Sequence, residues 1–179
     1  MSTISAPKYL ASGYSVQESD GKLYLINHHT SGFYVIGYII ALFTFILGIN
    51  SLVIPFFLYS EGENYLLAAA ILFPLTLVAS AALFWIRKTV MSRHRRPIAQ
   101  CDVLAIIDLQ KRSLLERDGR LLSSLDDVHL QKQLQLTSSA PSFALVWPEG
   151  KRTIVRGNAF AGGNTAVVNA LRQHGIRQK

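Results

Sequence analysis

This chain of 179 residues reads FYVIGYIIALFTFILGINSLVIPFFLY at 33–59 and LLAAAILFPLTLVASAALFWI at 66–86. The two stretches hold 27 and 21 residues, and neither contains an acidic, basic or histidine residue. At about 1.5 Å of rise per helical residue, either stretch is long enough to cross a hydrocarbon layer of roughly 30 Å. The sequence therefore predicts a transmembrane hairpin of two helices over 33–87.

A signal peptide is the main alternative explanation of the first stretch. The apolar residues begin only at Phe33, and no basic region precedes them directly. Their run is also much longer than the apolar core of a signal peptide, which is about 7–15 residues. We therefore expect the first stretch to be retained as a membrane span.

Charge predicts the orientation of the hairpin. The connection 60–65 contains two acids and no base, whereas bases follow the second stretch closely. Basic residues near the ends of spans remain on the cytoplasmic side. We expect a multi-pass protein of the bacterial inner membrane with both termini in the cytoplasm. The bases that carry this prediction are Arg87, Lys88, Arg93, Arg95 and Arg96.

The composition gives no sign of catalysis. The formal net charge is +7, and Cys101 is the only cysteine, so an intrachain disulfide is excluded. The five histidines have no metal-site spacing with cysteine or acidic partners. Neither a catalytic constellation nor a nucleic-acid-binding motif is present. We therefore expect a protein that is not an enzyme, with no cofactor, no metal and no nucleic-acid partner.

In the polar parts of the chain, the residue pattern predicts strands followed by one helix. Asp20-Gly21 lies between two β-prone runs, which is typical of a hairpin with strands at 14–18 and 22–27. Asp118-Gly119 suggests a second hairpin. Helical spacing of apolar residues, with Gly175 as a stop, predicts a terminal helix over 164–174. The remaining strands are expected at 103–109, 114–117, 120–122, 128–136, 143–147 and 151–156.

The clearest alternation lies at 128–136, where apolar and polar residues alternate with period two. This period is typical of a half-buried antiparallel strand. Lys132 interrupts the apolar face, so we expect it at an edge or extended toward solvent. The apolar face would comprise Val128, Leu130, Leu134 and Leu136, and the polar face would include Gln131, Gln133 and Gln135.

These patterns divide the chain into four parts. An N-terminal cytoplasmic segment with a β-hairpin covers 1–32, and the membrane hairpin covers 33–87. A basic linker follows at 88–100, and a cytoplasmic β domain with a C-terminal helix covers 101–179. Since both soluble parts face one compartment, the N-terminal hairpin can join the sheet of the last part.

Three stretches carry a resemblance to a known family. They are DVLAIIDLQKRSLLERDGRLLSSLDDVHLQKQLQL at 102–136, SFALVWPEGKRTIV at 142–155 and TAVVNALRQHG at 165–175. With the apolar hairpin before them, they resemble small bacterial membrane proteins with a pleckstrin-homology-like (PH-like) domain. The resemblance implies an α+β membrane protein with a transmembrane helical hairpin and a small antiparallel β sandwich or barrel, in which seven strands are closed by a C-terminal helix. A five-stranded barrel or another α+β sandwich would give a similar pattern.

We expect the basic domain to bind a protein partner or anionic lipid headgroups at the membrane surface. An immunity protein against a membrane-acting toxin and an accessory subunit of a larger membrane complex are the alternatives. Self-association is a further interaction that the apolar helices allow. The candidate partner or lipid surface comprises Lys88, Arg93, Arg95, Arg96, Lys151, Arg152, Arg156, Gln131, Gln133 and Gln135.

Overall fold

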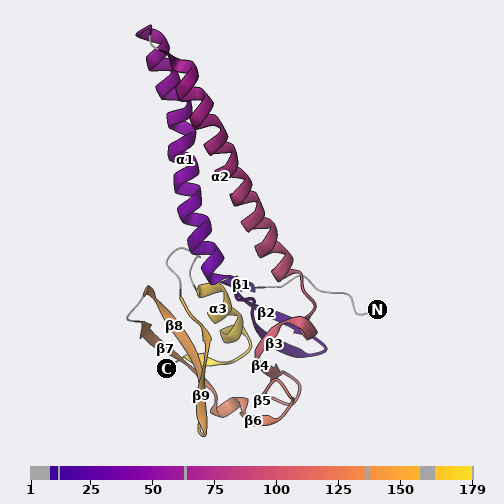
Figure 1. The fold of residues 1–179 in the computed structure, drawn as a ribbon. Coiled ribbons are helices and arrows are strands. Elements are labelled where there is room, and N and C mark those ends of the chain that lie inside the picture. The colour runs from indigo at the N-terminus through magenta and orange to yellow at the C-terminus, as the bar shows by residue number, and fades with distance from the viewer. Residues whose placement is uncertain (1–8, 12, 63, 136–137, 158–163, 179) are drawn as a thin grey trace. The chain divides into compact units, whose positions relative to one another are not determined.

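The computed structural model describes residues 9–11, 13–62, 64–135, 138–157 and 164–178. The chain divides into two compact units, which we describe separately (Figure 1). The first, Gly32–Ser92, contains most of the two long helices and is called the helical hairpin. The second combines Met1–Ser31 with Arg93–Lys179 and is called the β domain.

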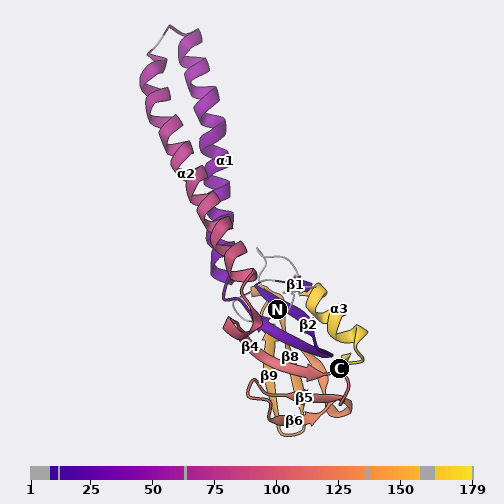
Figure 2. The same cartoon turned by 90° about the vertical axis from the view of Figure 1, so that its right-hand side faces the viewer.

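The helical hairpin consists of α1 (Ser31–Ser60) and α2 (Tyr65–His94), each 30 residues long. Figure 2 shows them side by side. Both have a mean hydropathy of 2.3 and are long and apolar enough to cross a membrane. Helix α2 extends two turns beyond the apolar run, so the first part of the segment 88–100, which we expected as a linker, is helical. A short 3-10 helix, Ile98–Gln100, follows.

Polar side chains within the apolar helices bond to carbonyl groups of their own helix. The donor atom lies 2.7–2.9 Å from the acceptor in each of these bonds. Such bonds reduce the cost of placing a hydroxyl or amide in an apolar medium. The pairs are Thr44 with Ile40, Asn50 with Ile46, Ser51 with Gly48, Thr76 with Leu72, and Ser80 with Thr76.

The β domain contains two sheets. In the first sheet each strand pairs antiparallel with the next one along the chain. Its strands are β1 (Tyr9–Ala11), β2 (Tyr14–Ser19), β3 (Lys22–Asn27), β4 (Asp102–Asp108), β5 (Ser113–Leu115) and β6 (Leu121–Ser124).

The second sheet has the order β10-β7-β8-β9. Its strands are β7 (His129–Gln135), β8 (Ser138–Trp147), β9 (Gly150–Val155) and β10 (Arg177–Gln178). The pairing of β10 with β7 is parallel, and the other pairings are antiparallel. Helix α3 (Thr165–Gln173) contacts β1 and β2 of the first sheet. The 3-10 helix Leu125–Asp127 connects the two sheets.

The strands on either side of the helical hairpin are direct neighbours. β3 pairs with β4 in a register that runs from Lys22 opposite Asp108 to Asn27 opposite Asp102. The segments before and after the hairpin therefore form one sheet, in which the N-terminal strands join those that follow the hairpin. A bulge between Leu25 and Ile26 allows both side chains to be buried.

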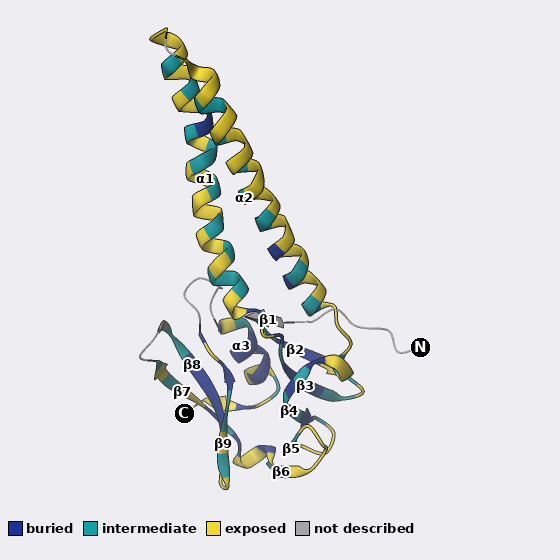
Figure 3. Ribbon diagram, in the orientation of Figure 1, coloured by how far each residue is buried: buried dark blue, intermediate teal, exposed yellow. Residues whose placement is uncertain are grey.

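The core of the β domain lies where the two sheets and α3 meet, and the facing sides of these elements are the buried ones in Figure 3. Since α3 is amphipathic, it covers this core with one face. Each element contributes apolar side chains that are almost fully buried. They include Val16, Leu23, Leu25, Ile107 and Leu114 from the first sheet, Leu130, Leu145, Ile154 and Val155 from the second, and Val167 and Leu171 from α3.

The expected strands and the terminal helix are confirmed to within a few residues, except that β8 begins five residues earlier than expected. The Asp20-Gly21 turn is also confirmed, since both residues have positive φ angles, 53° and 70°. Strands β1 and β10 were not expected, because three and two residues are too short to show a period. The described residues form ten strands rather than the seven that the resemblance implies.

The expected alternation of β7 is wrong beyond Lys132. Leu134 is 94% exposed instead of buried, because a bulge between Gln133 and Gln135 shifts the register with β8. Such a shift changes the side of the sheet on which the following residues lie. Lys132 is exposed, as expected, and Leu136 lies outside the described residues.

Two glycines allow a test of backbone geometry in the β domain. Gly13 has φ +86°, and an added Cβ would lie 2.7 Å from Thr30 Oγ1. Gly119 has φ +87°, with open space around the same position. Gly119→Ala should cost about 1 kcal/mol of unfolding free energy, from the left-handed backbone alone. Gly13→Ala adds a steric overlap and should cost about 2–4 kcal/mol. Urea denaturation measures both, and equal losses would contradict the packing at Gly13.

Candidate functional site

The basic residues that follow the apolar run differ in their environments. Lys88 is exposed on the helical hairpin, and Arg95 and Arg96 are exposed in the β domain. Arg93 is half-buried, and its guanidinium donates to the carbonyl of His29 at 2.9 Å. Arg95 and Arg96 form no ion pair with any of the residues that the structure describes. They are therefore available to an external anion, whereas Arg93 has an internal role.

A buried histidine connects the last residues of α2 to the first sheet. His28 Nδ1 lies 3.2 Å from the carbonyl oxygen of Arg93, and His28 Nε2 lies 2.7 Å from Ser15 Oγ. A carbonyl only accepts, so Nδ1 of the neutral ring donates and Nε2 accepts from the Ser15 hydroxyl. The ring of His94 stands edge-on to that of His28, with the centroids 4.4 Å apart. The contacts of His28 therefore suit the neutral form of its ring.

Burial is the main cause that lowers the pKa of His28 from 6.5 to about 4. The neighbouring His94 ring lowers this pKa further, and the carbonyl of Arg93 acts in the opposite direction. His28 is therefore uncharged at neutral pH, and it belongs to the framework of the β domain rather than to a titrating site.

Arg152 joins the two sheets. Its guanidinium donates to the carbonyl of Leu104 and to Glu116 Oε1, both at 2.7 Å. Arg120 donates to the other carboxylate oxygen of Glu116. These hydrogen bonds, first from Arg152 and then from Arg120, lower the pKa of Glu116. Although Arg152 belongs to the expected partner surface, its charge is used within the β domain.

The other members of the expected surface lie on strands β7 and β9 of the second sheet or just after β9. Lys151 and Arg156 are exposed on and just after β9, and Gln131 is exposed on β7. The backbone carbonyl of Gln133 accepts from Ser142 Oγ at 3.3 Å. The side-chain amide of Gln135 is oriented with its oxygen toward Gly157 and Ser142. This oxygen accepts from their backbone N–H groups at 3.0 and 3.2 Å.

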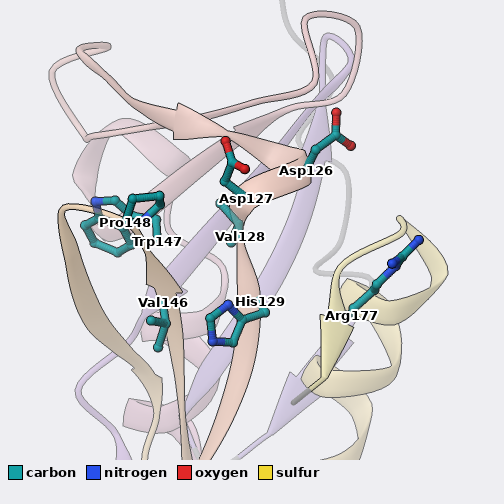
Figure 4. A pocket seen from close by; sticks show the side chains of 8 residues that line it. All are labelled: Asp126, Asp127, Val128, His129, Val146, Trp147, Pro148 and Arg177. Carbon is teal, nitrogen blue, oxygen red and sulfur yellow. The ribbon is translucent and has the colours of Figure 1, made fainter.

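An open pocket of about 450 Å³ lies on the β domain where β7 begins and β8 ends (Figure 4). Trp147 and Pro148 form part of its wall, Asp127 adds a carboxylate and Arg177 adds a guanidinium. Asp126 also lines it, but its carboxylate accepts from Arg112 at 2.6 Å. The sequence did not reveal this pocket, because β10 brings Arg177 beside His129 through a parallel pairing without a sequence signature.

In the part of the chain that the structure describes, no group of three or more His, Cys, Asp and Glu side chains could hold a metal ion. Comparisons with family models, curated proteins and solved structures found no match to this chain. The architecture and the exposed charges are therefore the features that indicate a function.

Arg152 and Lys151 are adjacent bases with different environments. Arg152→Ala should lower the unfolding free energy by about 1–3 kcal/mol, because Glu116 and the Leu104 carbonyl lose a charged donor. Lys151→Ala removes an exposed side chain and should change it by less than about 0.5 kcal/mol. Denaturant unfolding of the full chain in mild detergent provides the comparison. A similar loss in both variants would show that the bonds of Arg152 contribute nothing.

His28 predicts how stability depends on pH. The pKa of His28 is about 4 in the folded state and near 6.5 in the unfolded state. Between these two pH values, His28 is therefore mostly protonated in the unfolded chain and mostly neutral in the folded chain. Its contribution is therefore full above pH 6.5 and is lost as pH falls toward 4. At about pH 5 the loss should approach 2 kcal/mol. Unfolding measured across this range should be clearly less pH-dependent for His28→Gln, and an unchanged profile would refute the assignment.

Proposed function

We propose that this chain is a non-enzymatic protein of the bacterial inner membrane. Its helical hairpin spans the bilayer with both termini in the cytoplasm. A basic, PH-like β domain then binds anionic lipid headgroups or a protein partner at the membrane surface. Because the β domain holds exposed bases next to the end of the second span, anionic headgroups are the ligand we favour.

The membrane assignment is supported by the length and surface of the helices. Each has 30 residues, about 45 Å at 1.5 Å per residue, which exceeds a hydrocarbon layer of roughly 30 Å. Large apolar side chains are exposed along both, among them Phe45, Phe56, Leu77 and Phe84. An apolar surface of this extent is unfavourable in water and suits a lipid environment. Bases at the end of α2 favour the cytoplasmic orientation.

The pairing of β3 with β4 carries the proposal. Asn27, the last residue of β3, is opposite Asp102, the first residue of β4. Only residues 28–30 separate β3 from α1, and residues 95–101 separate α2 from β4. The chain therefore leaves and re-enters the sheet at neighbouring points through short connections. If the helices span the bilayer, these connections tether the β domain at its surface.

The exposed bases lie in one of these connections. Arg95 and Arg96 directly follow α2, nine and ten residues after the end of its apolar run at Ile86. A base near an anionic membrane surface contributes around 1 kcal/mol of attraction, and the effect extends over about a Debye length. Charges placed here would therefore act on lipid headgroups at short range.

A PH-like fold is consistent with two sheets around one core, closed by the helix α3. The extra strands β1 and β10 lie at sheet edges. The pocket beside Trp147 supports a protein partner as the second ligand, since an aromatic wall with nearby charges of both signs suits a peptide side chain.

The lipid proposal predicts the effect of Arg95→Gln combined with Arg96→Gln. In mixed micelles, the purified full chain should bind phosphatidylglycerol more tightly than phosphatidylcholine. The double variant should weaken binding to phosphatidylglycerol by roughly tenfold or more, because two attractive charges are lost. High salt should weaken the binding of the native chain in the same direction.

The combination Lys151→Gln and Arg156→Gln is the matched control, since it removes two exposed bases on and after β9. A larger loss of affinity in this control would show that the lipid-binding surface lies at β9 instead. Unchanged affinity in both variants would refute headgroup binding. Affinity purification of the tagged chain with a stoichiometric protein would then favour the protein partner.

A further inference from the structure

Residues on the surface of helix α1 recur at intervals of three and four, so they form faces that run along the helix. Some of these faces are covered and others are exposed. One face turns toward α2, since Ser51 is 4% exposed and a Cβ at Gly37 would lie 3.5 Å from Ile86. Its residues, which recur at intervals of three and four, are all buried or half-buried. They are Gly37, Ile40, Thr44, Leu47, Ser51, Pro55 and Leu58. This face is used within the hairpin.

A neighbouring face of α1 is about half exposed, and its residues belong to neither buried cluster of the described residues. Its members recur at strict intervals of three and four residues, as in a coiled coil. Six of them are large apolar side chains, each 41–59% exposed. We call it the Asn50 face, and it comprises Ile36, Ile39, Phe43, Ile46, Asn50, Val53 and Phe57.

Asn50 distinguishes this face from the rest of the exposed surface of α1. The adjacent face, Tyr38, Leu42, Phe45, Ile49, Leu52, Phe56 and Tyr59, has polar groups only on the tyrosines at its two ends. Asn50 Nδ2 donates to the carbonyl of Ile46 at 2.8 Å, which uses one of its two N–H groups. None of the described residues donates to its Oδ1. Hydrocarbon chains offer no hydrogen bonds, so the remaining donor and acceptor favour a protein partner.

We propose that a second copy of this chain packs against the Asn50 face to form a parallel homodimer. This inference rests on the proposed membrane insertion. Two copies inserted in the same orientation place Asn50 at the same depth, and a two-fold axis brings the two side chains together. An amide has partial negative charge on oxygen and partial positive charge on nitrogen. It is therefore complementary in charge to its own copy.

The position of Asn50 also fits the interface of a coiled coil. A single asparagine at a core position of a heptad fixes the register and the number of helices. Hydrogen bonds between helices in a membrane contribute about 0.6–1.7 kcal/mol. Asn50 therefore selects the face and the register, while the apolar side chains around it supply the packing.

Cysteine crosslinking in native membranes tests which face is used. In a Cys101→Ser background, Val53→Cys lies on the Asn50 face and Leu52→Cys lies on the adjacent apolar face. Oxidation should give disulfide-linked dimers of the Val53→Cys chain and much fewer of the Leu52→Cys chain. Equal crosslinking of the two variants, or none, would overturn the proposed face.

The role of Asn50 is tested with the full chain reconstituted in vesicles. Asn50→Leu should raise the dimer dissociation constant, measured by energy transfer between labelled chains, by about 3- to 20-fold. Asn50→Gln keeps the amide and should retain most of the affinity. An unchanged constant in Asn50→Leu would overturn the role of the amide.

Extraction by alkaline carbonate separates this inference from the proposed function. A chain that resists extraction but stays monomeric would overturn the dimer alone. A chain that is extracted would overturn membrane insertion, and the dimer with it.

Discussion

The pairing between β3 and β4 is the interaction on which the rest of the structure depends. It closes the sheet across an insertion that runs from residue 28 to residue 101. Without this ladder, β1, β2 and β3 would be separated from the core that they share with β4, β5 and α3. Val16, Leu23 and Leu25 belong to the same buried cluster as residues from beyond the hairpin, so the two parts of the β domain share one core.

Polar contacts inside the β domain complement this ladder and determine which charges remain outside. His28 binds the carbonyl of Arg93, and Arg152 binds Glu116 and the carbonyl of Leu104. His28 is buried and Arg152 and Glu116 are half-buried, so breaking either contact leaves a polar group that is shielded from water without its partner. Among the residues that the structure describes, Arg95 and Arg96 form no ion pair of this kind. An excess of basic residues therefore divides into a structural part and an exposed part, and only the exposed part is available for binding.

The sequence predicts the elements that local chemistry determines. Length and hydropathy indicate α1 and α2, and the pair Asp20-Gly21 indicates its hairpin, because a type I′ turn requires two positive φ angles. Features that depend on contacts between distant segments are missed. The bulge that exposes Leu134, the parallel pairing that places Arg177 beside a pocket, and the internal bonds of Arg152 follow from tertiary packing. An alternating pattern or a count of charges does not contain that information.

The polar side chains of the two units differ in where they find hydrogen-bond partners. In the β domain, side chains such as Ser15 and Glu116 find partners on other strands or loops. In the helical hairpin, hydroxyl groups bond to carbonyl groups one turn away, which uses their single donor. Asn50 has two donors and a strong acceptor, and one bond to its own helix leaves most of that capacity unused. In the proposed dimer, a second amide at the same depth would supply what neither its own helix nor a lipid chain can offer.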